Sequence, residues 1–372
     1  MRDRVTKTQT LFLFGLINYL LGFAIQASII FLPLLGAELG ASDFQVGLLG
    51  SVYGASFLLS SLFSGWKSDS LGRMLFMRWG LLLCSAAFAC QILADSVFML
   101  TLCRSAVGLA LGISTAATIA YAFEMGMDMG KFSAYASLGW IFSALTAGLV
   151  NSIQMLFLFS AIASLLSFTL TFLIKETLPQ EAVKKPNLFQ VLRRGSRIYL
   201  AVALRHIGAT SVWIILPLHL VALGMDKSFI SLAWVTNFTV QFLVMRTLER
   251  FPEHKIFAVG QGLSVLVFTS LAFASGKAPL LATQALLGVA WSLLYVGALL
   301  IVLKSGEERG TAGGIFQSTL NFCAAIGPLL GGLIAQGWGY RGVMVFAAAL
   351  GVVGMLIAVP KTAPPAPAPN KR

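Results

Sequence analysis

The stretch "GWKSDSLGR", residues 65–73, places a lysine, an aspartate and an arginine inside an otherwise apolar part of the chain. The preceding "SVYGASFLLSSLF" and the following "MLFM" carry no charge. Of the 372 residues, 58% are hydrophobic and 11% are charged, whereas a soluble globular protein has about 25% charged residues. So few charges cannot cover a water-exposed surface, and most of the surface must therefore face lipid. The composition predicts an all-α, polytopic membrane protein.

Twelve apolar runs are long enough to cross a bilayer, which takes about 20 residues. They lie at 9–35, 44–64, 74–94, 96–123, 131–152, 154–175, 198–223, 228–247, 255–275, 278–303, 312–335 and 340–360. The predicted organisation is a terminal segment (1–8), a six-helix bundle (9–175), a central loop (176–197), a second six-helix bundle (198–360) and a disordered Pro-rich tail (361–372). Within the loop, "LFQVLRR" fits either a short helix on the membrane surface or a linker.

Lysine and arginine residues orient these spans. Of the 26 lysine and arginine residues, two lie inside spans (Arg104 and Arg205), and three lie in loops on one side of the membrane (Lys227, Lys277 and Arg341). All the others lie at the termini or in loops on the opposite side, which predicts a multi-pass plasma-membrane protein with both termini in the cytoplasm. The net charge of +12 then indicates contact with anionic lipid headgroups rather than with nucleic acid. We expect the protein to act as a monomer.

Features of enzymes and metal proteins are missing from the sequence. The four cysteines lie inside apolar segments without metal-site spacing, and the three histidines are far apart. No G-x4-G-K-[ST] loop is present, so ATP is not the direct energy source. We therefore predict no catalytic residue, no cofactor and no bound metal.

The sequence also repeats itself half a chain later. "LPLLGAELG" (32–40) returns as "LPLHLVALG" (216–224), and "AGLV" (147–150) returns as "GGLI" (331–334). The pattern Arg104-x3-Gly108 returns as Gln284-x3-Gly288, and "SDSLGR" (68–73) has a degenerate counterpart in "LERFPE" (248–253). These matches predict two six-helix bundles with the same membrane orientation, and a substrate site at the midplane between them.

The opening stretch suits a charged gate at the cytoplasmic helix ends. Gly72 permits a sharp turn, and Gly65 permits a close helix approach. The Asp69 carboxylate can face the N-terminus of another helix, and Arg73 can pair with Glu124 at the end of the fourth span. We expect such charges to hold the inner ends of the halves together and to separate when the gate opens.

These residues resemble the major facilitator superfamily, whose loop between helices 2 and 3 reads G-x-L-x-D-R-x-G-R-K-x-x-L. Gly65, Asp69, Gly72 and Arg73 match this pattern, whereas Lys67, Ser70, Met74 and Met77 depart from it. The R-x-x-x-G pattern of helix 4 is similar to Arg104 and Gly108, and "GPLLGG" (327–332) resembles the Gly-Pro-rich helix 11. The resemblance, over about residues 10–360, implies the fold of that family. It also implies an inner-gate network of Asp69, Arg73 and Glu124, with Glu249 and Arg250 as a weaker twin.

Polar and aromatic residues inside the spans are the candidates for a substrate path, because ionisable groups deep in a span are usually functional. They are Asn18, Gln26, Arg104, Arg205, His206, Trp213, Asn237, Trp291, Tyr295, Gln317 and Asn321. In the resembled family helices 1, 4, 7 and 10 line the central cavity, which favours Gln26, Arg104, His206 and Tyr295. Two alternatives stay open: the amides can simply bond between helices, and Arg205 can extend to the interface.

All fourteen acidic residues lie in loops, at termini or at span ends. Two arginines and a histidine without a carboxylate favour an anionic or zwitterionic solute. If protons are coupled, His206 is the candidate carrier, since imidazole titrates near neutral pH, and the family pattern adds Arg104. The expected function is secondary active transport of a small organic solute by alternating access, with efflux favoured by the resemblance. A transporter-like sensor or partner-binding protein, and a multidrug or sugar efflux carrier, are the alternatives.

Overall fold

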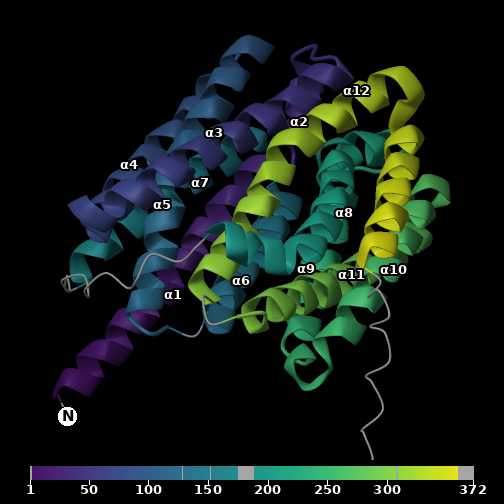
Figure 1. The fold of residues 1–372 in the computed structure, drawn as a ribbon. Helices are drawn as coiled ribbons and strands as arrows, with labels where there is room; N and C mark the ends of the chain where they lie inside the picture. The colour runs from purple at the N-terminus through teal and green to yellow at the C-terminus, as the bar shows by residue number, and fades with distance from the viewer. Residues whose placement is uncertain (1, 128, 151, 175–187, 307–308, 359–372) are drawn as a thin grey trace, which may run out of the picture.

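The computed structural model describes residues 2–127, 129–150, 152–174, 188–306 and 309–358, which form helices and no β-strand (Figure 1). The long helices are α1 (Arg2–Ile29), α3 (Asp43–Leu71), α4 (Arg73–Cys90), α5 (Val97–Glu124), α6 (Met129–Val150), α7 (Ile153–Leu170), α8 (Leu188–Ala222), α9 (Lys227–Met245), α10 (Glu253–Phe273), α11 (Lys277–Lys304) and α12 (Arg309–Ala358). The short ones are α2 (Leu32–Glu38) and the 3-10 turns η1 (Gln91–Leu93), η2 (Thr171–Leu173) and η3 (Leu248–Arg250).

Twelve segments cross the bundle, as the sequence predicted. Eleven helices in the described part of the chain are long and apolar enough to span a membrane. The last of them, α12, consists of two helices, because Gly339 has φ 72° and interrupts the helical backbone. The predicted loop at 336–339 is therefore reduced to a kink at a single glycine, whose lack of a Cβ permits this φ.

Two helices extend beyond the predicted apolar spans. The second span was predicted to end at residue 64, but α3 continues to Leu71, and only Gly72, with φ 99°, separates it from α4. The seventh span was predicted to start at residue 198, but α8 starts at Leu188, so "LFQVLRR" is the first part of a membrane-crossing helix. Hydropathy marks where a helix leaves the lipid, whereas the helix itself can continue into water. Residues 176–187 of the predicted central loop and the tail 361–372 lie outside the described residues.

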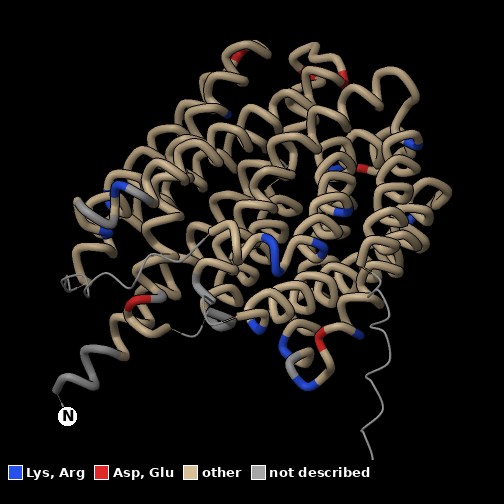
Figure 2. The backbone as a smooth tube through the Cα atoms, in the orientation of Figure 1, with Lys and Arg blue, Asp and Glu red and all other residues tan. Residues whose placement is uncertain are grey.

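The helices form two halves, α1–α7 and α8–α12, which Figure 1 colours from purple to blue and from teal to yellow. They pack together mainly through two helix pairs, α3 with α12 and α6 with α9. We call the face at which α1 begins and α12 ends the inner face, and the face with the turns at 39–42 and 223–226 the outer face. Figure 2 shows the charged residues mainly near helix ends and turns, with long uncharged stretches between them.

The packing repeats between the halves as the sequence did. In α4, a Cβ added at Gly80 would overlap the backbone of Ser114 in α5. In the second half, a Cβ added at Gly260 of α10 would overlap the backbone of Leu294 in α11. Gly260 and Leu294 follow Gly80 and Ser114 in the sequence by the same number of residues by which Gln284-x3-Gly288 follows Arg104-x3-Gly108. The duplicated sequence therefore folds into duplicated helix contacts.

Candidate functional site

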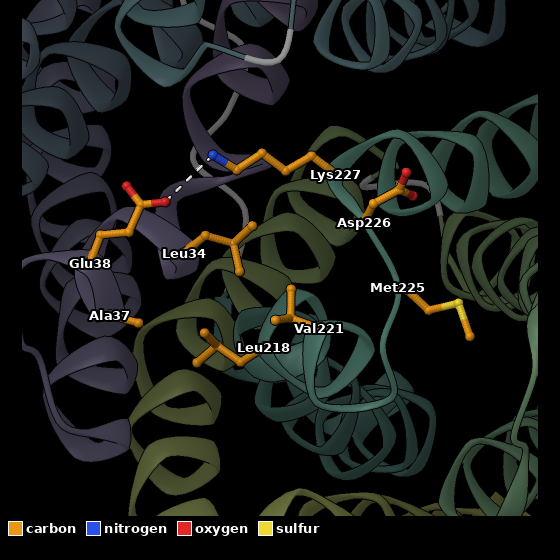
Figure 3. A pocket seen from close by; sticks show the side chains of 8 residues that line it. All are labelled: Leu34, Ala37, Glu38, Leu218, Val221, Met225, Asp226 and Lys227. Atoms are coloured by element: carbon orange, nitrogen blue, oxygen red, sulfur yellow. Dashed lines mark hydrogen bonds and ion pairs between the residues drawn. The ribbon is translucent and has the colours of Figure 1, made fainter.

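A pocket of about 530 Å³ opens on the outer face between the two halves (Figure 3). It is lined by Leu34, Ala37, Glu38, Leu218, Val221, Met225, Asp226 and Lys227. The Lys227 side chain extends across it, and its Nζ lies 3.5 Å from Glu38 Oε1. Because its walls come from both halves, the pocket keeps this shape only while the halves meet at the outer face.

Two further hydrogen bonds join the halves at the outer face. The Tyr340 hydroxyl donates to Asp43 Oδ1 at 3.1 Å, and the Phe44 backbone N–H donates to Gln336 Oε1 at 3.2 Å. Asp43 and Phe44 sit at the start of α3, and the other two residues sit around the kink of α12. These contacts close the outer face, and the sequence reasoning missed them.

Glycines set how closely α3 and α12 approach below these bonds. A Cβ at Gly47 would overlap the Pro328 carbonyl, with the Cα of Gly332 2.9 Å away. A Cβ at Gly54 would overlap the backbone of Ala324. The two backbones are therefore in direct contact over the outer part of the pair.

The same helices diverge toward the inner face. Gly65 follows Gly47 in α3, and Gly314 precedes Gly332 in α12, by the same interval in the sequence. At about 3.6 residues per turn, that interval is a whole number of turns, about five, so each glycine lies on the contact face of its helix. Among the described residues, nothing lies within 4 Å of a Cβ placed at Gly65 or at Gly314. The halves are thus packed together at the outer face and apart along the inner part of this helix pair.

The predicted gate residue Arg73 pairs with Glu124 at the inner face. Its Nη2 and Nε atoms lie 2.8 and 3.0 Å from Glu124 Oε1, and its Nη1 donates to Ser68 Oγ at 3.0 Å. The pair joins α4 to α5 within the first half, so in this conformation it does not link the halves. The side chains of Asp69 and Glu249 lie outside the described part of the chain.

A charge-inverted copy of this pair lies in the second half. Lys304, at the end of α11, lies 3.0 Å from Glu253, at the start of α10. Glu253 takes the place of Arg73 in the repeat and Lys304 takes the place of Glu124, so acid and base have exchanged places. The sequence reasoning selected Glu249 and Arg250 as the twin. The equal spacing of 51 residues within both pairs was the signal that could have identified the observed one.

Arg104 is buried inside the first half. Its guanidinium carbon lies 4.3 Å from the ring centroid of Tyr53 in α3, and its Nη1 donates to Gln91 Oε1 at 3.4 Å. Its Nε and Nη2 have no hydrogen-bond acceptor among the described residues. Arg104 therefore connects α5 to α3 and η1 and keeps spare donor capacity.

Arg205 is buried inside the second half, with 0% of its surface exposed. This excludes extension to the membrane interface. Its Nε donates to Ser264 Oγ at 2.9 Å, and its guanidinium carbon lies 5.2 Å from Trp291 and 5.3 Å from Phe268. Burying such an ion costs several kcal/mol, whereas a desolvated cation–π contact returns about 2 kcal/mol.

An aromatic cluster lies beside Arg205. His206 stacks on Trp291 with ring centroids 5.0 Å apart, and Trp213 meets both edge-on at 5.3 and 6.0 Å. Tyr295, one turn further along α11, lies 5.4 Å from Trp291. The sequence predicted each of these residues separately, and the helix spacing together with the packing of α8 against α11 brings them together.

Two of the five predicted amides bond between helices. Asn18 donates to the Phe132 carbonyl of α6 at 2.6 Å, and Asn237 donates to the Gln284 carbonyl of α11 at 3.1 Å. The exposed Gln317 donates to Asn321 one turn away in α12, and Gln26 is half-buried. The interhelical alternative therefore describes Asn18 and Asn237.

The chain is similar to a known protein family, to named proteins of that kind and to a solved structure. A family model described as "Major Facilitator Superfamily" matches residues 11–203 and 198–372. The sialic acid transporter NanX of Escherichia coli (strain K12) is 30% identical over 103 residues, 28% of this chain and 25% of that protein. The multidrug resistance protein MdtG of Proteus mirabilis (strain HI4320) is 24% identical over 366 residues, 89% of this chain and 90% of that protein. A crystal structure of a bacterial homolog of the human lysosomal transporter Spinster, inward-facing and occupied, matches with a TM-score of 0.79 at 14% identity, over 94% of this chain and 96% of that one.

Proposed function

The chain belongs to the major facilitator superfamily, and we propose that it moves a small organic solute across the membrane by alternating access between its two halves. Its relatives and fold are those of membrane transporters rather than enzymes. One observation carries the proposal: α3 and α12 touch along their outer parts and stand apart at Gly65 and Gly314. A carrier that rocks about a central site must pass through such a state and through its opposite.

The solute is anionic or zwitterionic. Two cationic side chains, Arg104 and Arg205, are buried in the bundle, and no acidic residue lies in the middle of a span. A cation entering this environment would meet like charges and no carboxylate, whereas a carboxylate or phosphate would gain charge-assisted hydrogen bonds. A relative named a sialic acid transporter is consistent with this preference.

Export is the favoured direction, and the proposed inner face is cytoplasmic. A relative that matches most of the chain is named a multidrug resistance protein, a name that fits efflux. The excess of lysine and arginine on the side of the termini supports the orientation and contact with anionic headgroups. We assign the protein to the plasma membrane as a monomer, and His206 and Arg104 to proton coupling if transport is coupled to protons.

At the inner face, Arg73 and Glu124, with Asp69, form one half of the gate. The second half is supplied by Glu253 and Lys304, in place of Glu249 and Arg250. Each pair ties two neighbouring helices of one bundle into a rigid unit. Rigid bundles are what a rocking mechanism requires, since the movement must then occur at the interface between the halves.

Flux into liposomes tests this function. Purified protein should move a carboxylate such as benzoate without ATP, and should move its neutral counterpart benzamide less. A Glu38→Cys/Lys227→Cys variant serves as the matched control, because a bifunctional thiol reagent with a reducible spacer can join these positions and hold the outer face closed. Cross-linking should stop flux and reduction should restore it. Flux that continues through the cross-linked protein, or no flux for a broad panel of organic anions, zwitterions and sugars, contradicts the proposal.

A further inference from the structure

The second half contains a buried cation without a matching anion. Arg205 has no exposed surface, and its hydrogen-bonding partner is the neutral hydroxyl of Ser264, through Nε. Both Nη1 and Nη2 lack an acceptor among the described residues. A guanidinium removed from water needs a counter-charge and acceptors for its five N–H groups. Two nitrogens with unused donors leave this requirement unmet.

Two further buried polar atoms without a partner among the described residues lie on rings that contact Trp291, as Arg205 does. The Trp213 indole nitrogen and the His206 Nδ1 are buried and have no partner among the described residues. Trp291 connects these groups: it lies 5.0 Å from the His206 ring, 6.0 Å from the Trp213 ring and 5.2 Å from the Arg205 guanidinium. Buried polar atoms are nearly always satisfied in folded proteins. A cation and polar atoms without partners that all lie around Trp291 therefore point to a ligand that forms hydrogen bonds and carries negative charge.

We propose that Arg205, with His206, Trp213 and the wall formed by Trp291, is an anion-binding site inside the second half. Its ligand is a small anion: either the carboxylate of the transported solute or an inorganic anion such as chloride. This inference rests on the proposed function only if the ligand is the carboxylate of the transported solute. The site is distinct from the environment of Arg104, where the guanidinium lies over the Tyr53 ring and reaches the side-chain oxygen of Gln91.

Thermal unfolding of the purified protein tests the site without requiring transport. A ligand that binds only the folded state raises the midpoint by an amount that grows with the logarithm of its concentration. Chloride is titrated against methanesulfonate, which has no carboxylate, at constant sodium concentration and ionic strength. We expect the midpoint to rise in wild type and in Arg104→Gln, and to stay flat in Arg205→Gln. Arg205→Lys, which keeps the charge but loses the fork of donors, should retain a reduced rise.

Benzoate and the neutral benzamide separate the two sources. If benzoate gives an Arg205-dependent rise that benzamide lacks and removes the further effect of chloride, the site takes the carboxylate of a solute. If the chloride effect adds to that of benzoate, the site holds an inorganic anion. A chloride effect of equal size in wild type and in Arg205→Gln, or no anion effect in wild type, overturns the proposal.

A second measurement covers the case in which Arg205→Gln does not fold. Iodide quenches tryptophan fluorescence on contact, and Trp291 lies against the proposed site. Wild type should show a saturable quenching component that the double variant Trp213→Phe/Trp291→Phe lacks, and chloride should reverse it. Identical, non-saturating quenching in the two proteins overturns the proposal. Flux measured in liposomes distinguishes a failure of the anion site from a failure of the transport function. Solute flux without any anion effect rejects the anion site only. An anion effect without flux for any solute rejects the transport function only.

Discussion

Two alanine substitutions on one face of α3 should push the protein in opposite directions. Gly47 lies against α12, where an added Cβ would overlap the Pro328 carbonyl and lie 2.9 Å from Gly332 Cα. Gly65, nearer the inner end of the same helix face, has no atom of the described residues within 4 Å of an added Cβ. Gly47→Ala should therefore destabilise the state closed at the outer face. Gly65→Ala should leave that state unchanged and destabilise the opposite state, in which the inner ends must approach.

The size of the effect follows from the packing. Forcing an extra methyl group into a filled contact costs about 1–3 kcal/mol, and here the obstacle is backbone, which cannot rotate away. In an equilibrium between two states, that cost changes their ratio by about 5- to 150-fold. Helix propensity acts in the same sense at both positions, because alanine favours a helix over glycine by about 1 kcal/mol. It therefore cannot produce opposite shifts.

The rate at which one cysteine is labelled reports the ratio of the two states. The cysteine is Leu34→Cys, in a background without the four native cysteines, because Leu34 lines the outer pocket and is 6% exposed in this state. A membrane-impermeant thiol reagent should label it faster after Gly47→Ala and more slowly after Gly65→Ala, each compared with the same background. Equal rates in all three proteins, or the same direction of change in both variants, would refute the reasoning.

Three further outcomes follow from the side-chain contacts. Tyr340→Phe removes a hydrogen bond to a carboxylate that joins the halves, worth about 1.5–3 kcal/mol, and should raise outer labelling without lowering the unfolding midpoint; unchanged labelling would count against its gate role. Ser264→Ala removes the Arg205 hydrogen bond, also worth about 1.5–3 kcal/mol, and should lower the unfolding midpoint by several degrees, whereas an unchanged midpoint would mean that the bond contributes nothing. Lys304→Glu should lower the unfolding midpoint, and the additional change Glu253→Lys should restore it. A double-mutant cycle measures this coupling, and simple additivity of the two changes would contradict the pairing.

Much of this architecture could be predicted from the sequence. Apolar length gave the twelve spans, and the repeated motifs gave two halves whose helix contacts recur at the same offset. The contact between Arg73 and Glu124 followed from their positions at the start of α4 and the end of α5, on the same face of the bundle. Such local and periodic features depend on neighbours in the sequence, which is why they could be read from one chain.

Other features required the tertiary structure. The outer contacts of Glu38 with Lys227 and of Tyr340 with Asp43 join residues of different halves that are far apart in the sequence. The helix end at Leu71 was missed because polar residues at 67–70 look like a loop, although a helix can extend beyond the lipid. That Arg205 reaches Ser264 rather than the interface depends on the packing of α8 against α10, which hydropathy does not report.

Pulsed electron-resonance distances between paired spin labels test alternating access most directly. One pair is placed at positions 38 and 227 on the outer face, and the other at 65 and 314 near the inner face, each in a background without native cysteines. Two populations are expected. The population with a short outer distance has a long inner one, and the solute shifts the balance between them. A protein in which both distances stay fixed with and without solute, or lengthen together, would contradict a carrier whose halves rock about a central site.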